Sequence, residues 1–368
     1  MKKYSSFIGL SLLLSTSIFS ILVIVCYFLF YQQPTIMYNW FQHIALPWGE
    51  FWSFIWQWIP FSVAELCWTI AILLGFSWVI GIIFLVVKRP SNWKKQLLWY
   101  CISILCAISF VWAGYTCFWA VGYRQPAFYS VESGLSSQPI SVEDLTKTTK
   151  YFAMQANTYA EKMPRVDGIF TPDILPLFSQ TDELYKQLEQ EFPKLQAPMR
   201  RAKPMLYSPI LSRFGFTGFY FPFTGEANVN IHSPASMVPV TIAHELAHQR
   251  GVVLEDEANF TAIAACLSQP NIIFQYSASL FGYIHLSNAL LSASPQTWQE
   301  ISDSLNPLVK QDLEHNNQFW ANYQSPISDA AESVYGGFLQ SHGENRGLNS
   351  YGDCVNLLVA YYQNKIPA

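Results

Sequence analysis

The stretch His244-Glu245-Leu246-Ala247-His248 is the most informative part of the chain, because it places two histidines four residues apart. Residues four apart on an α-helix share one face, so both imidazoles can reach a single metal ion. Glu245 lies beside that face, where its carboxylate can take a proton from a water molecule on the metal. The spacing therefore predicts a zinc site for hydrolysis, most commonly of a peptide bond.

The residues around this motif indicate a buried helix. The preceding segment 237–243 is apolar or small, Pro239 suits a first helical turn, and Ser236 suits the N-cap position. Gly251 is expected to end the helix. Two histidines and a glutamate on a buried helix need polar partners, and a zinc ion would supply one. The alternative is an ordinary amphipathic helix with exposed histidines.

A catalytic zinc site takes three protein ligands and leaves one position open for water. Glu255 and Glu257 are the candidates for the third ligand, because both lie at the start of a second helix just after Gly251. In a tight helical hairpin Glu257 would lie level with His248, and Glu255 would lie nearer the turn. Spacing alone leaves both open, and an acidic first turn that interacts with the helix dipole is the plain alternative.

The segment Glu255-Asp256-Glu257-Ala258-Asn259 resembles the Glu-x-x-Ala-Asp/Asn element of gluzincin metallopeptidases. The resemblance implies that Glu255 ligates zinc and that Asn259 orients a ligand histidine. The chain departs from that pattern, because the gap between His248 and Glu255 is shorter than in most gluzincins. The spacing to Gly251 is instead similar to that of metzincins, but no histidine follows three residues later. We therefore favour Glu255 as the ligand, with Glu257 as the alternative.

A wider resemblance covers most of the chain. Its features are three N-terminal apolar segments, the segments 221–230, 244–249 and 255–259, and Ser350-Tyr351-Gly352. In these features the chain resembles a bacterial membrane family catalogued as domain of unknown function 3810. The resemblance implies that the chain is a zinc peptidase, but it does not indicate which substrate the peptidase cleaves.

Three apolar segments, at about 7–30, 61–87 and 97–121, are long enough to span a bilayer. Lysines precede the first segment and cluster between the second and third, whereas the loop 31–60 has no Lys or Arg. The positive-inside rule therefore predicts a multi-pass protein of the cell membrane with a cytoplasmic N-terminus. The part of the chain after about Arg124 would then lie outside the cytoplasm.

Charge divides the chain in the same way. Residues 1–122 carry six Lys or Arg and two acidic residues, whereas residues 123–368 carry fifteen Lys or Arg and twenty-three acidic residues. We expect a transmembrane anchor over 1–122, a linker over 123–140 and a catalytic domain over 141–368. The acidic part has no basic cluster, which argues against a nucleic acid as partner. Its two cysteines, Cys266 and Cys354, either pair or remain buried thiols, and we slightly favour thiols.

The predicted fold is mainly α, with a helical zincin-like outer domain and a small β-hairpin or sheet next to the motif helix. Residues 205–230 are the strand region, since aromatic and β-branched residues alternate there with Gly and Ser. In zinc peptidases that resemble this chain, an edge strand pairs with the extended substrate. A plain structural hairpin is the alternative. The predicted substrate-binding residues are Phe219, Tyr220, Asn228 and Asn230.

Zinc peptidases usually need a hydrogen-bond donor for the oxyanion besides the metal. The candidates are Tyr351, Tyr335, His342 and His232. Tyr351 ranks first as a catalytic residue, because it lies in the Ser-Tyr-Gly element that carries part of the family resemblance.

These features favour a membrane-anchored metallopeptidase with Zn²⁺ as cofactor, acting on a peptide or protein outside the cytoplasmic membrane. The lipid bilayer is its second expected partner. The alternative is a non-catalytic membrane protein in which a structural metal site fastens helices together. Such a site needs no base at Glu245, and no further Cys or His lies near the motif in sequence to close it.

Overall fold

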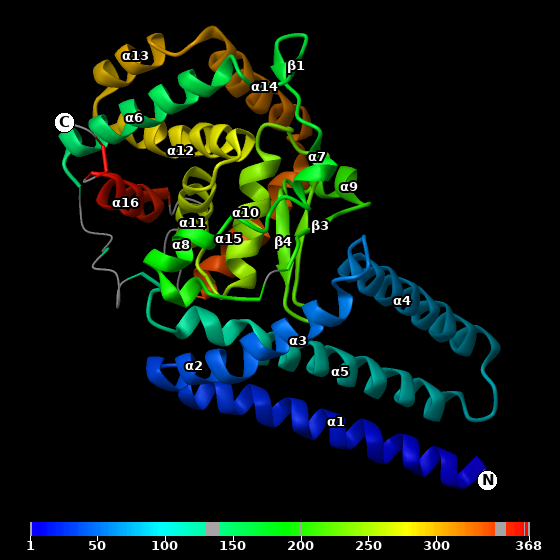
Figure 1. Cartoon of the computed structure of the whole chain (residues 1–368). Helices are drawn as coiled ribbons and strands as arrows, with labels where there is room; N and C mark the ends of the chain where they lie inside the picture. The colour runs from blue at the N-terminus through cyan, green and yellow to red at the C-terminus, as the bar shows by residue number, and fades with distance from the viewer. Residues whose placement is uncertain are drawn as a thin grey trace. The chain divides into compact units, whose positions relative to one another are not determined.

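The structure is a computed structural model that describes residues 2–129, 135, 140–198, 200–342, 351–363 and 365–366, without the side chains of residues 2–10 and 351. Most of these residues lie in α-helices, and short strands form two small sheets (Figure 1). The mainly helical class predicted from the sequence is confirmed. The chain divides into two compact units that alternate along the sequence.

The first unit contains Met1–Trp52, Val63–Gln125 and Pro222–Thr224. Its helical elements are α1 (Lys2–Phe30), α2 (Pro34–Trp40), a π-helix (Phe41–Ala45), most of α3 (Leu46–Trp56), α4 (Val63–Lys88), α5 (Trp93–Phe118) and a 3₁₀ turn (Ala120–Arg124). Three stretches are long and apolar enough to cross a membrane, namely Ser11–Phe30, Val63–Lys88 and Trp93–Phe118. They coincide with the three predicted segments, so a membrane protein is supported by length and composition.

The segment 31–60, predicted to be a loop, is largely helical. Pro34 lies in the first turn of α2, where its missing N–H costs no hydrogen bond. In α3 the indole of Trp48 stacks on the ring of Phe118, with centroids 4.1 Å apart. Aromatic packing of this kind stabilises a helix whose sequence carries no clear amphipathic pattern.

The second unit contains Ser53–Ser62, Pro126–Phe221 and Gly225–Ala368. Its first half holds α6 (Val142–Ala160), β1 (Arg165–Val166), β2 (Ile169–Phe170), α7 (Ile174–Leu177), α8 (Lys186–Glu191), a 3₁₀ turn (Pro193–Leu195), β3 (Lys203–Pro204), α9 (Ser208–Arg213), β4 (Gly218–Phe221) and β5 (Glu226–Val229). Its second half holds α10 (Val238–Gln249), α11 (Glu255–Ser268), α12 (Ile272–Ala293), α13 (Pro295–Asp303), α14 (Pro307–Tyr323), α15 (Pro326–Ser341) and α16 (Tyr351–Tyr362).

Helices α10, α11 and α12 form the centre of the second unit, and α6 packs along α12 (Figure 1). Gly282 of α12 permits this packing, since a Cβ atom there would lie 2.3 Å from Cε1 of Phe152. The predicted linker also contributes to this core. Tyr129 is 2% exposed, and its ring packs edge-on against Phe192 and Phe260.

A three-stranded sheet lies next to α10, with the strand order β3-β5-β4. Strands β4 and β5 form an antiparallel hairpin in which Gly218 lies opposite Val229, and β3 pairs with β5 in parallel. Strand β4 therefore lies at an edge of this sheet and packs against α10. The position of the predicted hairpin next to the motif helix is confirmed.

Helix α10 begins differently from the prediction. Met237 occupies the N-cap position, and Ser236 Oγ makes no hydrogen bond with a described residue. Instead, Ser277 of α12 accepts a hydrogen bond from the backbone N–H of Val240 at 3.1 Å. A neighbouring helix thus satisfies one of the free N–H groups of the first turn. The helix ends as predicted, because Gly251 follows it with a φ of 90°.

The segment Ser53–Ser62 belongs to the second unit although it lies between two membrane-length helices in sequence. The buried ammonium of Lys203 donates hydrogen bonds to the carbonyl oxygens of Trp56, at 2.8 Å, and Ile59. Burial lowers the pKa of Lys203, while Glu226 at 3.9 Å opposes that effect. Ser62 donates to the side chain of Asn228 at 2.6 Å. These contacts make the segment a structural part of the sheet that adjoins α10.

Replacing Lys203 by methionine should lower the free energy of unfolding by about 1–3 kcal/mol, because buried carbonyl groups lose their donor. The measurement is thermal unfolding of the full chain in detergent. Lys150→Met is the matched control, since Lys150 is exposed on α6. Equal midpoints for the two variants would show that the Lys203 contacts do not hold the segment.

Candidate metal centre

Helix α10 presents His244 and His248 on one face, as the four-residue spacing predicts. The two rings lie 4.6 Å apart between centroids. His248 is 4% exposed, and the side chain of His244 is 15% exposed. The surrounding helix is buried at most of its positions, so the two imidazoles lie in an environment of low polarity.

The turn after α10 fixes the orientation of His248. Its Nδ1 atom lies 2.7 Å from the carbonyl oxygen of Val252, so Nδ1–H donates and Nε2 remains available as a ligand. Asn259, which the gluzincin resemblance assigned to orient a histidine, lies four residues after Glu255 on α11. No hydrogen bond between Asn259 and either histidine occurs among the described residues. The backbone carbonyl of Val252 therefore orients His248, which is the role that the gluzincin resemblance gave to the side chain of Asn259.

Glu255, the first residue of α11, brings its carboxylate to both imidazoles. Its Oε2 lies 3.2 Å from Nε2 of His244, and its Oε1 lies 3.7 Å from Nε2 of His248. The ligand atoms of the three residues all lie within 4.8 Å of one another. Ligands of a tetrahedral zinc ion at about 2.0–2.1 Å lie roughly 3.3–3.4 Å from each other. The three residues could therefore hold a metal ion, after small shifts of their ligand atoms.

The three side chains are strongly coupled by charge. Burial would raise the pKa of Glu255, but His248 and His244 outweigh burial and hold it well below its usual value. Burial opposes a charged His248, yet Glu255 raises the pKa of that imidazole to about 9. A positive charge is therefore favoured between these groups, and a divalent cation would compete with protons for the same place.

Glu245 lies beside this cluster and is 2% exposed. Burial raises its pKa to about 7; the charges of His244 and His248 act against that rise, and Glu255 adds to it. Its Oε2 atom has no hydrogen-bond partner among the described residues. A buried carboxylate oxygen without a donor is unfavourable, and a water molecule held at the cluster would satisfy it. The arrangement suits a general base.

Gly218 of β4 makes room for the Glu245 carboxylate. A Cβ atom at position 218 would lie 2.5 Å from Glu245 Oε1 and 2.7 Å from the backbone oxygen of Asn228. Only glycine fits this approach without a shift in structure. Gly218 could not be predicted from local sequence, because the need for glycine arises from contact between a strand and a helix whose contacting residues lie 27 positions apart.

Glu257, the alternative ligand, lies outside the cluster. Two residues along a helix correspond to a rotation of about 200°, so Glu255 and Glu257 point to opposite sides of α11. Glu257 is 7% exposed and accepts a hydrogen bond from the backbone N–H of Tyr129 at 3.3 Å. Burial raises its pKa to about 7, although backbone N–H groups lower it. Glu257 therefore holds the segment around Tyr129 against α11.

Tyr335 of α15 enters the metal centre from a distant part of the chain. Its hydroxyl donates a hydrogen bond to Glu255 Oε1 at 2.7 Å, and its ring packs edge-on against Phe216 at 5.5 Å. No local pattern marks this tyrosine, because its partner lies 80 residues away. Tyr351, ranked first by the sequence analysis, has a side chain that lies outside the described residues.

The other two oxyanion candidates bind elsewhere. Nδ1 of His232 lies 3.2 Å from Ser212 Oγ, and Nδ1 of His342 lies 2.8 Å from the carbonyl oxygen of Phe338.

Two of the four predicted substrate-binding residues are fully engaged in the fold. Asn228 is 0% exposed and bonds with Ser62 and with the backbone of the hairpin. Asn230 is also 0% exposed and bonds with Ser212, Phe216 and His232. These hydrogen bonds engage both side chains in the fold, and a role for either residue in binding a substrate stays a prediction.

Phe219 and Tyr220 lie on the edge strand β4 and are partly exposed, so they stay predicted substrate-binding residues. Cys266 and Cys354 are buried free thiols, and burial raises the pKa of both.

A family model described as "Protein of unknown function (DUF3810)" matches residues 40–359 of the chain. The match covers most of the 368 residues, including two of the membrane-length helices and the whole His-His-Glu cluster. The comparisons with curated proteins and with solved structures gave no match. The description of the family states no activity, so the chemistry of the site rests on its geometry.

Replacing Gly218 by alanine should lower the free energy of unfolding by about 1–3 kcal/mol, because the backbone oxygen of Asn228 cannot yield to a new Cβ. Thermal unfolding of the full chain in detergent measures the effect. Gly336→Ala in α15 is the control, since no atom lies within 4 Å of a Cβ there. Alanine in a helix should be neutral or stabilising by up to about 1 kcal/mol. An unchanged midpoint in Gly218→Ala would contradict the close approach of β4 to α10.

Proposed function

The chain belongs to the DUF3810 family, and from the geometry of its metal centre we propose that it is a membrane-anchored zinc metallopeptidase with a zincin-like fold. One observation carries the proposal. Ligand atoms of His244, His248 and Glu255 converge within 4.8 Å, and the unpartnered carboxylate oxygen of Glu245 lies buried beside them. Three ligands with an adjacent base are the pattern of a hydrolytic site.

His244, His248 and Glu255 would hold the zinc ion. When bound, zinc supplies Lewis acidity to a water molecule and to the carbonyl group of a substrate. Glu245 takes the proton of the attacking water at its free oxygen and passes it to the leaving amine nitrogen. Without a metal, burial raises the pKa of this carboxyl to about 7, and the charge of a bound zinc ion would lower it again. Glu245 would then be ionised at neutral pH, as a general base requires.

Tyr335 has two possible contributions in this mechanism. In its present position the hydroxyl holds the Glu255 carboxylate in place. A rotation of the side chain would let the same hydroxyl donate to the negative charge that develops on the substrate oxygen. Strand β4, at the edge of the sheet beside α10, is the proposed pairing surface for an extended peptide, with Phe219 and Tyr220 in contact with it.

The proposed location is the outer side of the cytoplasmic membrane. Three membrane-length helices support attachment to a bilayer. Four basic residues support a cytoplasmic position for the turn between α4 and α5: Lys88 at the end of α4, Arg89 in the turn, and Lys94 and Lys95 at the start of α5. If all three helices span the membrane, the catalytic part would lie on the opposite side from the N-terminus.

A structural metal site is the second candidate function. Such sites usually have four protein ligands, whereas the cluster found among the described residues has three. A structural site would also have no use for the free oxygen of Glu245. Both features favour catalysis.

The test is cleavage of a mixed peptide library by the full chain in detergent with zinc, followed by mass spectrometry of the products. Glu245→Gln should lower the cleavage rate about 10²–10⁴-fold and leave zinc content unchanged, because it removes the base and no ligand. Glu257→Gln is the matched control. It changes a glutamate that is also buried and has a pKa raised to about 7, but that lies outside the cluster.

Cleavage by wild type and by Glu257→Gln, with loss in Glu245→Gln, is the expected result. Equal cleavage by wild type and Glu245→Gln would contradict the assigned base. A folded wild-type chain that binds zinc and cleaves no peptide would favour the structural site.

A further inference from the structure

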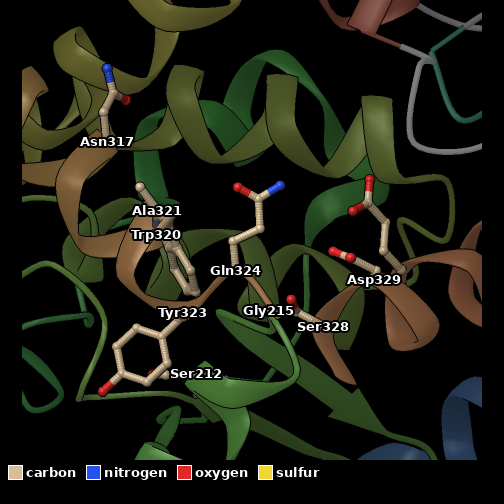
Figure 2. Close-up of a pocket in the computed structure, with 10 residues that line it drawn as sticks. Ser212, Gly215, Asn317, Trp320, Ala321, Tyr323, Gln324, Ser328 and Asp329 are labelled. Carbon is tan, nitrogen blue, oxygen red and sulfur yellow. The ribbon is translucent and has the colours of Figure 1, made fainter. Parts of the chain in front are cut away.

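A cavity of ≈ 400 Å³ lies in the second unit between α14, α15 and the segment that joins α9 to β4 (Figure 2). Its size suits a small ligand group or an amino-acid side chain. Trp320 and Tyr323 line it from α14, and Asp329 and Glu332 line it from α15. Gln324 lies between the two helices and adds an amide to the lining.

The lining of this cavity favours a positive charge. Two carboxylates lie three residues apart on α15, and none of the lining residues is Lys, Arg or His. The aromatic faces of Trp320 and Tyr323 offer cation–π contacts in addition to the carboxylates. Asp329 lies in the first turn of α15, where the helix dipole accounts for an acidic residue, but Glu332 lies beyond it.

Helix α15 connects the cavity with the metal centre. Glu332 lines the cavity, and Tyr335, three residues later on the same face, donates to the zinc-ligand candidate Glu255. Three residues of helix correspond to about 4.5 Å along the axis. Neighbouring residues of one helix therefore line the cavity and contact the metal centre.

The segment that joins α9 to β4 also connects the cavity with the metal centre. Gly215 lines the cavity, and the next residue, Phe216, packs on the ring of Tyr335. Two residues further on, Gly218 begins the edge strand β4 and contacts the Glu245 carboxylate. A peptide that pairs with β4 would thus run past Glu245 with one side chain directed toward the cavity.

We propose that this cavity is the specificity subsite of the peptidase and that it takes a cationic amine or guanidinium group of the substrate, close to the cleaved bond. The inference rests on the proposed function and names the class of substrate: peptides with a basic side chain, including diamino acids, or with a free N-terminal ammonium group. Because both sources present the same charge, the experiment separates them.

The experiment measures binding and cleavage in parallel on the full chain in detergent with zinc. Fluorescence anisotropy follows binding of labelled peptides to the Glu245→Gln chain, and mass spectrometry follows cleavage by chains that keep Glu245. The peptides come as three matched forms with lysine, norleucine or glutamate at one position, each with a free or an acetylated N-terminus. Norleucine retains the length of lysine and lacks its charge.

Two pairs of substitutions test the acidic residues. Asp329→Asn with Glu332→Gln removes the charge of the cavity. Glu300→Gln with Asp303→Asn is the matched control, since these residues have the same spacing and are exposed on α13. We expect the lysine peptide to be preferred over the norleucine peptide by about 10-fold, and the preference to disappear only in the cavity pair. A preference that depends on the free N-terminus instead would assign the cavity to the terminal ammonium.

The outcomes separate the two proposals. Cleavage of lysine and norleucine peptides at equal rates, or an unchanged preference in the cavity pair, would overturn the subsite while the peptidase function stands. Charge-dependent binding that the cavity pair abolishes, without cleavage of any peptide by wild type, would overturn the peptidase function and leave the cavity as an amine-binding site.

Discussion

The left-handed turn at Gly251, with a φ of 90°, is the constraint on which the metal centre depends. It lies three residues after His248, just past the end of α10 at Gln249, and returns the chain so that α11 begins at Glu255. The same turn places the carbonyl oxygen of Val252 against His248 Nδ1, which directs Nε2 toward the carboxylate. A side chain other than glycine would strain this conformation, because a Cβ clashes with the backbone in that region. One backbone turn therefore brings together His248 and Glu255, which lie seven residues apart in the sequence.

The surrounding fold supports a concentration of charge that would be unfavourable elsewhere. Two imidazoles and two carboxylates lie together in a largely buried environment, and burial alone raises the pKa of both acids. Attraction between Glu255 and the histidines compensates for part of that cost, and the hydroxyl of Tyr335 adds a hydrogen bond to the same carboxylate. Glu245 is the exception, because its Oε2 atom has no donor in the part of the chain that the structure describes. Such a group is retained in proteins where chemistry requires it.

Local features of the site could be predicted from the sequence, and features that depend on distant contacts could not. The spacing of His244 and His248 predicts their shared face, and Gly251 marks the end of the helix. The choice between Glu255 and Glu257 depends on the rotation of α11, which spacing does not define. The sequence predicts Asn228 and Asn230 to bind substrate, because they lie in the strand region expected to pair with an extended peptide. Ser62 of the segment Ser53–Ser62 bonds with Asn228, and Ser212 of α9 bonds with Asn230. Tyr335 is one of the four predicted oxyanion donors, but its hydrogen bond to Glu255 depends on the position of α15, which no local pattern predicts.

The central claim is that His244, His248 and Glu255 form one metal site, and X-ray absorption spectroscopy at the zinc edge tests it most directly. The zinc-loaded full chain should show a four-coordinate zinc ion with nitrogen and oxygen ligands at about 2.0–2.1 Å, of which two are imidazoles. Glu255→Gln should alter the coordination or lose the metal, whereas Glu257→Gln should leave the spectrum unchanged. A sulfur ligand, fewer than two imidazoles in wild type, or a change in Glu257→Gln without one in Glu255→Gln would contradict the account.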